Sequence, residues 1–164
     1  MGELGRAAIV AVLVRLLREA FAGSPGSWTY FTDGGPGSGL FGTLDALTAA
    51  EASQVSGPGG TSIASHVDHV CASLALSVRE MRGETTSRDR SRSWTVSLLD
   101  DAEWAALRTR LRQEYEHASV AVQTLPALNE DALATAFGAI AHAAYHLGAI
   151  RQRLALKAAA FDEG

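Results

Sequence analysis

The sequence predicts an all-α protein, a four-helix bundle whose first connection is long and rich in glycine and proline. Apolar residues recur at helical spacing along four long stretches, and no run shows sustained apolar/polar alternation. Residues 23–60 hold ten of the 16 glycines and three of the four prolines, which marks them as a connection. Four helices joined by loops favour an up-and-down arrangement. With 164 residues, 47% of them hydrophobic, the chain can bury a core, so we expect a single domain over 1–164.

The first helix is expected over 3–22, as an amphipathic helix with Arg15, Arg18 and Glu19 in solvent. Its apolar run 7–17 is too short to span a bilayer. Arginines also follow this run where a signal peptide would carry small residues and a cleavage site. We therefore expect a cytoplasmic protein that does not bind membranes.

The connection that follows is expected to contain one short helix over 40–52. Four aromatic residues indicate that it packs on the body of the protein, because a disordered linker rarely carries so many. They are Trp28, Tyr30, Phe31 and Phe41. The glycine-rich segment 33–39 lacks the Lys-Ser/Thr ending of a phosphate-binding loop and does not follow a strand, so it is interpreted as a turn.

The second helix is expected over 61–82, and Gly83 ends it. The third begins at Asp100 or Asp101, either of which can cap it, and runs to about Thr124. Asn129 can cap the last helix, which runs to about residue 160. The polar segment 83–93 is expected to be a loop, anchored to the bundle by Trp94 and Trp104.

Charge and cysteine content exclude several classes of function. The net charge is −4 and the pI about 5.7, whereas proteins that bind nucleic acid through its phosphates are usually basic. The local arginines Arg88, Arg90 and Arg92 are interpreted as a solvated loop. The single cysteine, Cys71, excludes an intramolecular disulfide and a cysteine-based metal cluster, and we expect it to be a packing residue.

Two histidine pairs carry the chemical interest of the sequence. His142 and His146 are four residues apart on the last helix, so both imidazoles lie on one face and could share a metal ion. His66 and His69 form a second pair on the second helix. Helical angles displace His69 from its apolar stripe much as they displace His142 and His146, whereas His66 points further inward. His66 is therefore either a buried hydrogen-bonded histidine or a further ligand, and His117, on a charged face, is expected in solvent.

Two motifs resemble the DinB-like, or YfiT-like, four-helix-bundle metalloproteins. Segment 61–70 (TSIASHVDHV) resembles the start of the family's second helix, with Thr61 in place of the usual Trp and His69 at the ligand position. Segment 142–152 (HAAYHLGAIRQ) resembles the last-helix motif, His-x-x-x-His followed by Leu-Gly-x-Ile. The resemblance implies that His69, His142 and His146 bind one divalent transition metal, Zn, Ni, Fe or Mn. His66 could replace or join His69.

The resemblance also implies an activity, because characterised members include transferases and isomerases that use low-molecular-weight thiols such as mycothiol or bacillithiol. A bacterial metal-dependent thiol transferase or hydrolase acting on a small molecule is one hypothesis. The alternative is a non-catalytic metal-binding or stress-response module, with a helical homodimer as its simplest form. Polar groups that could serve a thiol ligand are Arg153, Glu80, Ser73 and the segment 33–39.

Overall fold

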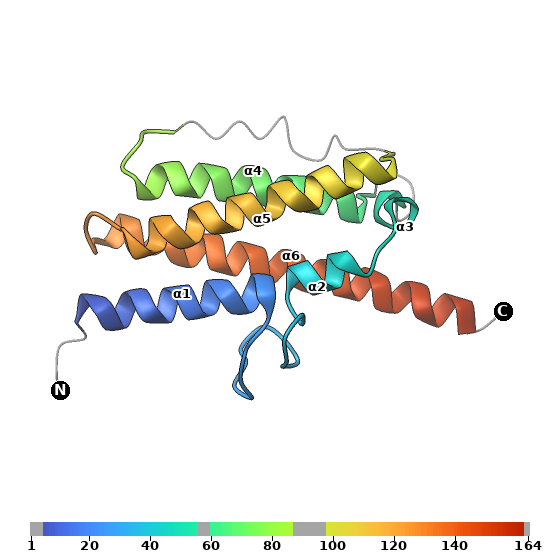
Figure 1. Ribbon diagram of the computed structural model, residues 1–164, viewed down its shortest axis with the longest axis horizontal. Helices are drawn as coiled ribbons and strands as arrows, with labels where there is room; N and C mark the ends of the chain where they lie inside the picture. Colours follow the sequence, from blue (N-terminus) through green and yellow to red (C-terminus); the bar gives the residue numbers. More distant parts are fainter. Residues whose placement is uncertain (1–4, 56–59, 87–97, 163–164) are drawn as a thin grey trace.

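The computed structural model describes residues 5–55, 60–86 and 98–162, with side chains described up to Leu156. Over these ranges the chain is helical and contains no strand, so the all-α prediction is confirmed. The helices, labelled in Figure 1, are α1 (Arg6–Ala22), α2 (Leu40–Asp45), α3 (Ala49–Ser53), α4 (Ile63–Met81), α5 (Asp101–Gln123) and α6 (Glu130–Asp162).

The four long helices form a bundle in which α4 packs against α5 and α6, and α1 packs against the same two helices. Figure 1 shows α1 and α6 running in one direction and α4 and α5 in the other. The expected up-and-down alternation is therefore wrong for α4 and α5, which are parallel. The chain between Met81 and Asp101 is long enough for such a connection, since parallel neighbours need a segment that returns along the bundle.

The helix starts follow the capping residues. Ser62 caps α4 and exchanges hydrogen bonds of 3.0 Å with Ser65, and Asp100 caps α5 in the same way with Glu103. Asn129 Oδ1 accepts the backbone N–H of Ala132 at 2.9 Å, at the start of α6. The predicted starts of α4, α5 and α6 are correct to within two residues, and Asp100 rather than Asp101 is the cap of α5. Helix α1 begins at Arg6, three residues after the expected start.

The single short helix expected over 40–52 is wrong, because the chain forms α2 and α3 with a break between them. Thr48 starts α3: its hydroxyl accepts the backbone N–H of Glu51 at 3.2 Å, and Glu51 Oε2 accepts the backbone N–H of Thr48 at 2.8 Å. This capping box makes Thr48 the beginning of a new helix instead of an interior position.

Trp104 fixes this connection to the bundle. Its side chain is buried, and its indole N–H donates to the carbonyl oxygen of Leu47 at 2.9 Å. Trp104 thus anchors the link between α2 and α3. Its expected partnership with Trp94 falls on residues outside the described ranges, as do Arg88, Arg90 and Arg92.

The first connection packs on the bundle through two of its four aromatic rings. Phe31 and Phe41 are half-buried, and the Phe41 ring centroid lies 5.3 Å from that of Tyr115 on α5. For Trp28 and Tyr30 the expected packing is wrong, since these side chains are 80% and 60% exposed. Around Trp28 and Tyr30, backbone hydrogen bonds rather than aromatic rings attach the connection to the bundle.

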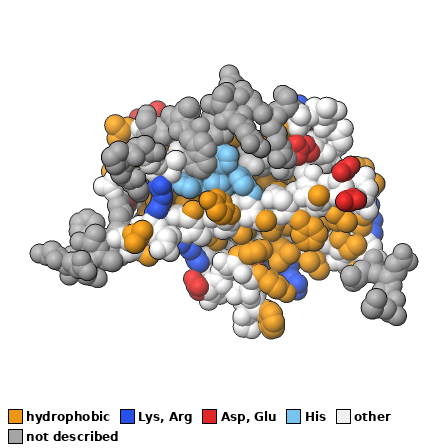
Figure 2. All heavy atoms as spheres, turned by 180° about the vertical axis from the view of Figure 1, so that it is seen from behind, with side chains coloured by type: hydrophobic (Ala, Val, Ile, Leu, Met, Phe, Trp, Pro, Cys, Tyr) orange, Lys and Arg blue, Asp and Glu red, His pale blue; other side chains and the backbone are white. Residues whose placement is uncertain are grey.

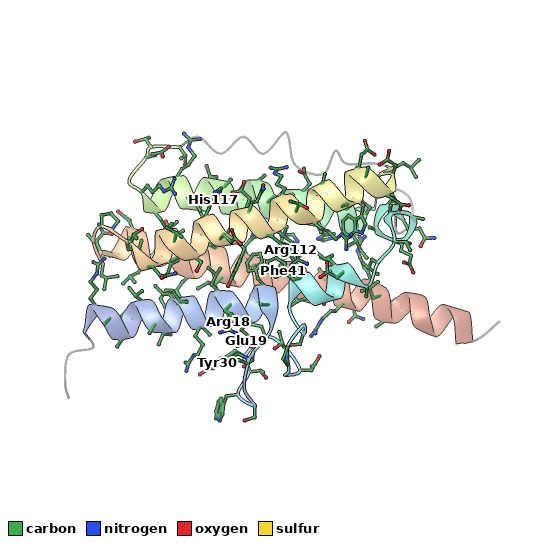
Figure 3. All side chains as sticks on the ribbon, viewed as in Figure 1. Arg18, Glu19, Tyr30, Phe41, Arg112 and His117 are labelled. Atoms are coloured by element: carbon green, nitrogen blue, oxygen red, sulfur yellow. The ribbon has the colours of Figure 1, made fainter. Side chains whose placement is uncertain are left out.

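That backbone contact runs to Glu19, which was expected in solvent and is in fact 3% exposed. Glu19 Oε1 accepts the backbone N–H groups of Tyr30 and Phe31 at 2.6 Å each and that of Thr32 at 3.2 Å. Figure 3 shows Glu19 near the end of α1, next to Tyr30. The connection folds back over the last turn of α1, a long-range effect that helical periodicity does not reveal.

Helix α6 is the central element for the site. The segment Glu130–Leu156 is long and apolar enough to cross a membrane by length and composition alone, and 39% of its apolar 18-residue stretch is buried in the bundle. In the bundle it packs against both α1 and α4, and Ile140, Leu147 and Ile150 lie in the core. Because α6 packs against two neighbouring helices, a large part of its surface is apolar, which explains its hydrophobic composition.

Candidate metal centre

Four histidines meet where α4 packs against α6. His66 and His69 lie one turn apart on α4, and His142 and His146 one turn apart on α6. Because the two helices are neighbours, each pair faces the other. The helical angles predicted the common displacement of His69, His142 and His146, and they placed His66 further inward. The ring centroids of His69 and His142 are 5.0 Å apart, and those of His66 and His146 are 5.1 Å apart.

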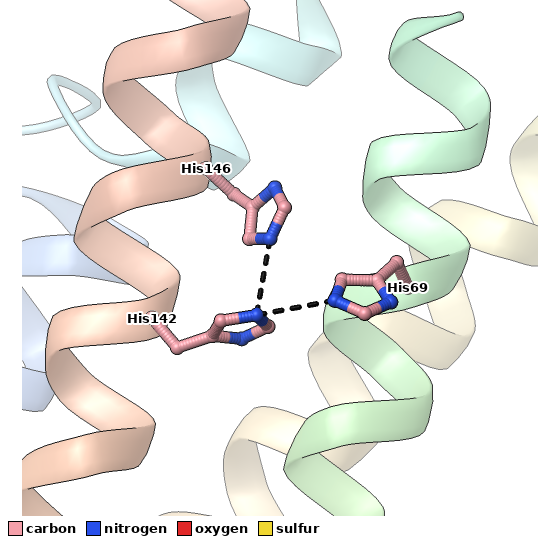
Figure 4. A group of neighbouring side chains, drawn as sticks. All are labelled: His69, His142 and His146. Atoms are coloured by element: carbon pink, nitrogen blue, oxygen red, sulfur yellow. Dashed lines mark hydrogen bonds between the residues drawn. The ribbon is translucent and has the colours of Figure 1, made fainter. Parts of the chain in front are cut away.

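The Nε2 atoms of three of these rings converge. His142 Nε2 lies 3.1 Å from His69 Nε2 and 3.1 Å from His146 Nε2 (Figure 4). The possible ligand atoms of these three residues all lie within 4.8 Å of one another. Two imidazole nitrogens bound at 2.0–2.1 Å lie about 3.3 Å apart on a tetrahedral ion and about 2.9 Å apart on an octahedral one. The observed spacing fits a single ion.

Hydrogen bonds alone account poorly for this arrangement. A neutral imidazole nitrogen carries either one hydrogen or one lone pair, so His142 Nε2 can serve only one ideal partner, yet it faces two. One divalent ion among the three nitrogens would accept a lone pair from each. The donor set, three imidazoles, is suited to Zn, Cu, Fe and Ni. These residues could therefore hold a divalent metal.

The site is buried on one side and open on the other. His146 is 2% exposed, and His66 is 7% exposed. His69 and His142 are half-buried, and Figure 2 shows histidine atoms at the surface near the centre of the face seen there. A small molecule could therefore approach the nitrogens from solvent.

Burial favours the neutral form of three of these imidazoles, His66, His69 and His146. Burial first, then the neighbouring rings of His142, His66 and His69, lower the pKa of His146 from 6.5 to about 3. Burial, then Arg153 and His69, lower the pKa of His66 to about 4, and burial also lowers the pKa of His69. Neutral imidazoles keep the lone pairs that metal ligands need.

His66 takes a position behind the three converging nitrogens. Its Nδ1 lies 2.8 Å from Nδ1 of His146, on the side of that ring opposite to Nε2, and its Nε2 lies 3.1 Å from the hydroxyl of Thr61. Arg153 donates to the Thr61 hydroxyl at 2.7 Å and also to the Thr61 carbonyl. Of the two sequence hypotheses for His66, the geometry favours the buried hydrogen-bonded histidine. Thr61 was noted only where it departs from a motif, and its link to Arg153 spans 92 residues, so no local pattern signals this contact.

The other polar candidates do not join the cluster. Glu80 follows His69 by 11 residues, about 16 Å along α4, and accepts a hydrogen bond from the Thr86 hydroxyl at 2.8 Å. Ser73 lies one turn beyond His69 and is half-buried. The segment 33–39 is bound by Arg151, which contacts Asp33 at 3.0 Å and the Ser38 carbonyl at 2.7 Å.

Two residues expected to be bystanders are confirmed as such. His117 lies on α5 with its side chain 60% exposed, and its Nδ1 is 3.6 Å from Glu114 Oε2 (Figure 3). Cys71 is fully buried, and burial raises the pKa of its thiol to about 12. A thiol in that environment is not a nucleophile.

Comparison with known families agrees with the motifs and the fold. The chain matches the model of the DinB superfamily over residues 38–150, more than half of its length. That range includes all four clustered histidines and Thr61, and it ends before Arg153. Neither a curated protein nor a solved structure matches the chain significantly. The matched range, the all-helical bundle and the two histidine motifs together identify the chain as a member of the DinB superfamily.

Proposed function

We propose that His69, His142 and His146 bind one divalent transition metal and that the bound ion makes this protein a metal-dependent thiol transferase. The observation that carries the metal site is the convergence of three Nε2 atoms, with His142 Nε2 at 3.1 Å from each of the other two. Three neutral protein ligands with positions left open are typical of catalytic rather than structural metal sites.

When bound, the metal supplies a Lewis acid that lowers the pKa of a coordinated water or thiol. The chain's own contribution is to hold three imidazoles in place, with the neutral forms of His69 and His146 favoured by burial, and to leave the side of His69 and His142 accessible. The deep side, at His146, is closed by α4 and by His66. A substrate would therefore enter from the half-exposed side.

The sulfur of the proposed reaction comes from a small molecule. Cys71 is fully buried, and its thiol is protonated at physiological pH because its pKa is about 12. The proposed thiol is therefore a low-molecular-weight one such as mycothiol or bacillithiol. The proposed reaction forms a bond between the thiol sulfur and an electrophilic carbon and breaks the bond from that carbon to its leaving group, such as a halide. The leaving group and the thiol proton pass to solvent.

Elemental analysis of untreated protein tests the metal site first. We expect about one equivalent of Zn, Ni, Fe or Mn per chain, lost in His142→Ala and strongly reduced in His69→Ala and His146→Ala. His117→Ala, which removes a histidine outside the cluster, should retain the metal. Protein without stoichiometric metal and without a thermal shift on adding any of these ions would overturn the proposal.

The catalytic part is tested separately with the metal-loaded protein. Mycothiol or bacillithiol and an electrophile such as an aryl halide are incubated with wild type and with His142→Ala, and loss of free thiol is followed. We expect turnover only in the wild type. Stoichiometric metal without turnover of any thiol would favour the alternative, a non-catalytic metal-binding module.

A further inference from the structure

The contacts behind His146 form a continuous line. From the cluster outward they join His146 Nδ1 to His66 Nδ1 at 2.8 Å, His66 Nε2 to the Thr61 hydroxyl at 3.1 Å, and that hydroxyl to Arg153 Nη2 at 2.7 Å. Arg153 also donates to the Thr61 carbonyl, which fixes Thr61 just before the cap of α4. The line thus connects the middle of α6, the start of α4 and a later turn of α6.

We propose that His66 and Thr61 are positioning residues that hold His146 in the tautomer whose Nε2 lone pair faces the metal. This inference rests on the metal site proposed above. Two Nδ1 atoms at 2.8 Å must share one hydrogen, which belongs to one ring and is accepted by the other. The metal decides which ring carries it.

If His146 Nε2 binds the ion, the single hydrogen of the neutral ring lies on Nδ1 and is donated to His66 Nδ1. The hydrogen of His66 then lies on Nε2, which faces the Thr61 hydroxyl. That oxygen has two lone pairs, so it can accept from His66 and from Arg153 together. Every contact in the line is then a donor meeting an acceptor.

The opposite direction of hydrogen-bond donation, from Thr61 through His66 to His146, is incompatible with metal binding by His146 Nε2. If Thr61 donates to His66 Nε2, the His66 hydrogen lies on Nδ1 and points at His146 Nδ1. His146 must then carry its hydrogen on Nε2, the atom 3.1 Å from His142 Nε2, where the lone pair is required. Outer residues that orient a ligating histidine in this way typically contribute 10–100-fold to metal affinity.

Zinc affinity of matched variants tests the inference, measured by competition with a chromophoric chelator. We expect His66→Phe, which keeps ring volume but has no acceptor, to bind zinc 10–100-fold more weakly than wild type. His66→Asn offers a side-chain oxygen near the place of Nδ1 and should recover most of this loss. Thr61→Val should weaken binding by a few-fold. His117→Phe makes the same exchange on an exposed histidine and should bind as wild type does.

Imidazole ¹⁵N spectra of the wild-type protein give a readout independent of folding defects in the variants. In the zinc-loaded protein we expect hydrogen on Nδ1 of His146 and on Nε2 of His66. Hydrogen on Nδ1 of His66, or wild-type zinc affinity in a folded His66→Phe, would overturn the inference while leaving the metal site intact. A wild-type protein that binds no zinc or other transition metal would overturn the proposed function, and this inference with it.

Discussion

Two regions of this small bundle bury polar groups, and they do so in opposite ways. At the end of α1, Glu19 presents one carboxylate oxygen to three backbone N–H groups, at 2.6, 2.6 and 3.2 Å. Between α4 and α6, His69, His142 and His146 present the same kind of atom to one another. In the first region donors meet an acceptor, and in the second potential acceptors converge.

The difference separates a structural polar group from a binding site. Buried polar groups are normally satisfied by hydrogen bonds, and Glu19 obtains its donors from its own chain. The three converging nitrogens instead have the spacing of ligands around one ion, so this region could hold a cation. Both regions are buried polar clusters, and the second is the one whose side chains are suited to a metal ion.

We expect the largest loss of stability when Glu19 is replaced, and this substitution tests the difference between the two regions. Glu19→Ala leaves three backbone N–H groups without their acceptor, and we expect it to lower the free energy of unfolding by about 3 kcal/mol. Glu19→Gln keeps one acceptor oxygen and should cost about 1 kcal/mol. Urea denaturation measures both. Zinc affinity should be unchanged, and a loss of zinc binding in a folded Glu19→Gln would contradict the separation of the two regions.

The histidine cluster should make the metal-free protein sensitive to acid. In the unfolded chain His66 and His146 titrate near 6.5, whereas in the folded chain their pKa values are about 4 and 3. Between pH 6.5 and pH 3 the unfolded chain binds protons that the folded chain does not. The free energy of unfolding is therefore highest above about pH 6.5 and decreases as the pH falls toward 3. Urea denaturation at several pH values in the presence of a chelator measures this. His66→Phe, which removes one of the two groups, should show a shallower decrease, and equal slopes would contradict the assignment.

The smallest effect is expected at Cys71, on the same helix as His69. Because Cys71 is fully buried and its pKa is about 12, a thiol reagent at pH 8 should not modify the folded protein but should modify one thiol per chain in urea. Cys71→Ala should cost roughly 1 kcal/mol and leave zinc affinity unchanged. Fast modification of the folded protein, or loss of zinc binding in this variant, would make Cys71 part of the site.

Local signals predicted the helices well and the path between them poorly. Asp100 with Glu103 and Asn129 mark helix starts through their own hydrogen bonds, which depend on neighbours three residues away. The parallel course of α4 and α5 is a matter of helix direction, and sequence periodicity carries no direction. The break at Thr48 was readable in principle, since the Thr-x-x-Glu capping box stands in the sequence.

The same distinction applies to the candidate site. The spacing of His142 and His146 and the displacement of His69 were compatible with a shared site, and the resemblance to the DinB-like family named these three residues as its ligands. The burial of Glu19 and the contact of Thr61 with Arg153 were missed, because these partners lie 11–13 and 92 residues away along the chain. Contacts of that kind follow from the packing of the bundle and from no pattern within one helix.

The neutrality of the groups around the cluster has a consequence for the electronic character of a bound ion. His69, His142, His146, His66 and Thr61 carry no negative charge. Asp68, next to His69, is paired with Arg110 at 2.8 Å, and its charge offsets only part of the lowering of the His69 pKa by burial. A divalent ion held by these residues would keep nearly its full double charge. Such an ion is electron-poor and favours an anionic exchangeable ligand, so a thiolate would bind in preference to a neutral amine or alcohol. Charge balance at the site would then be completed by the substrate, with the protein supplying only neutral donors.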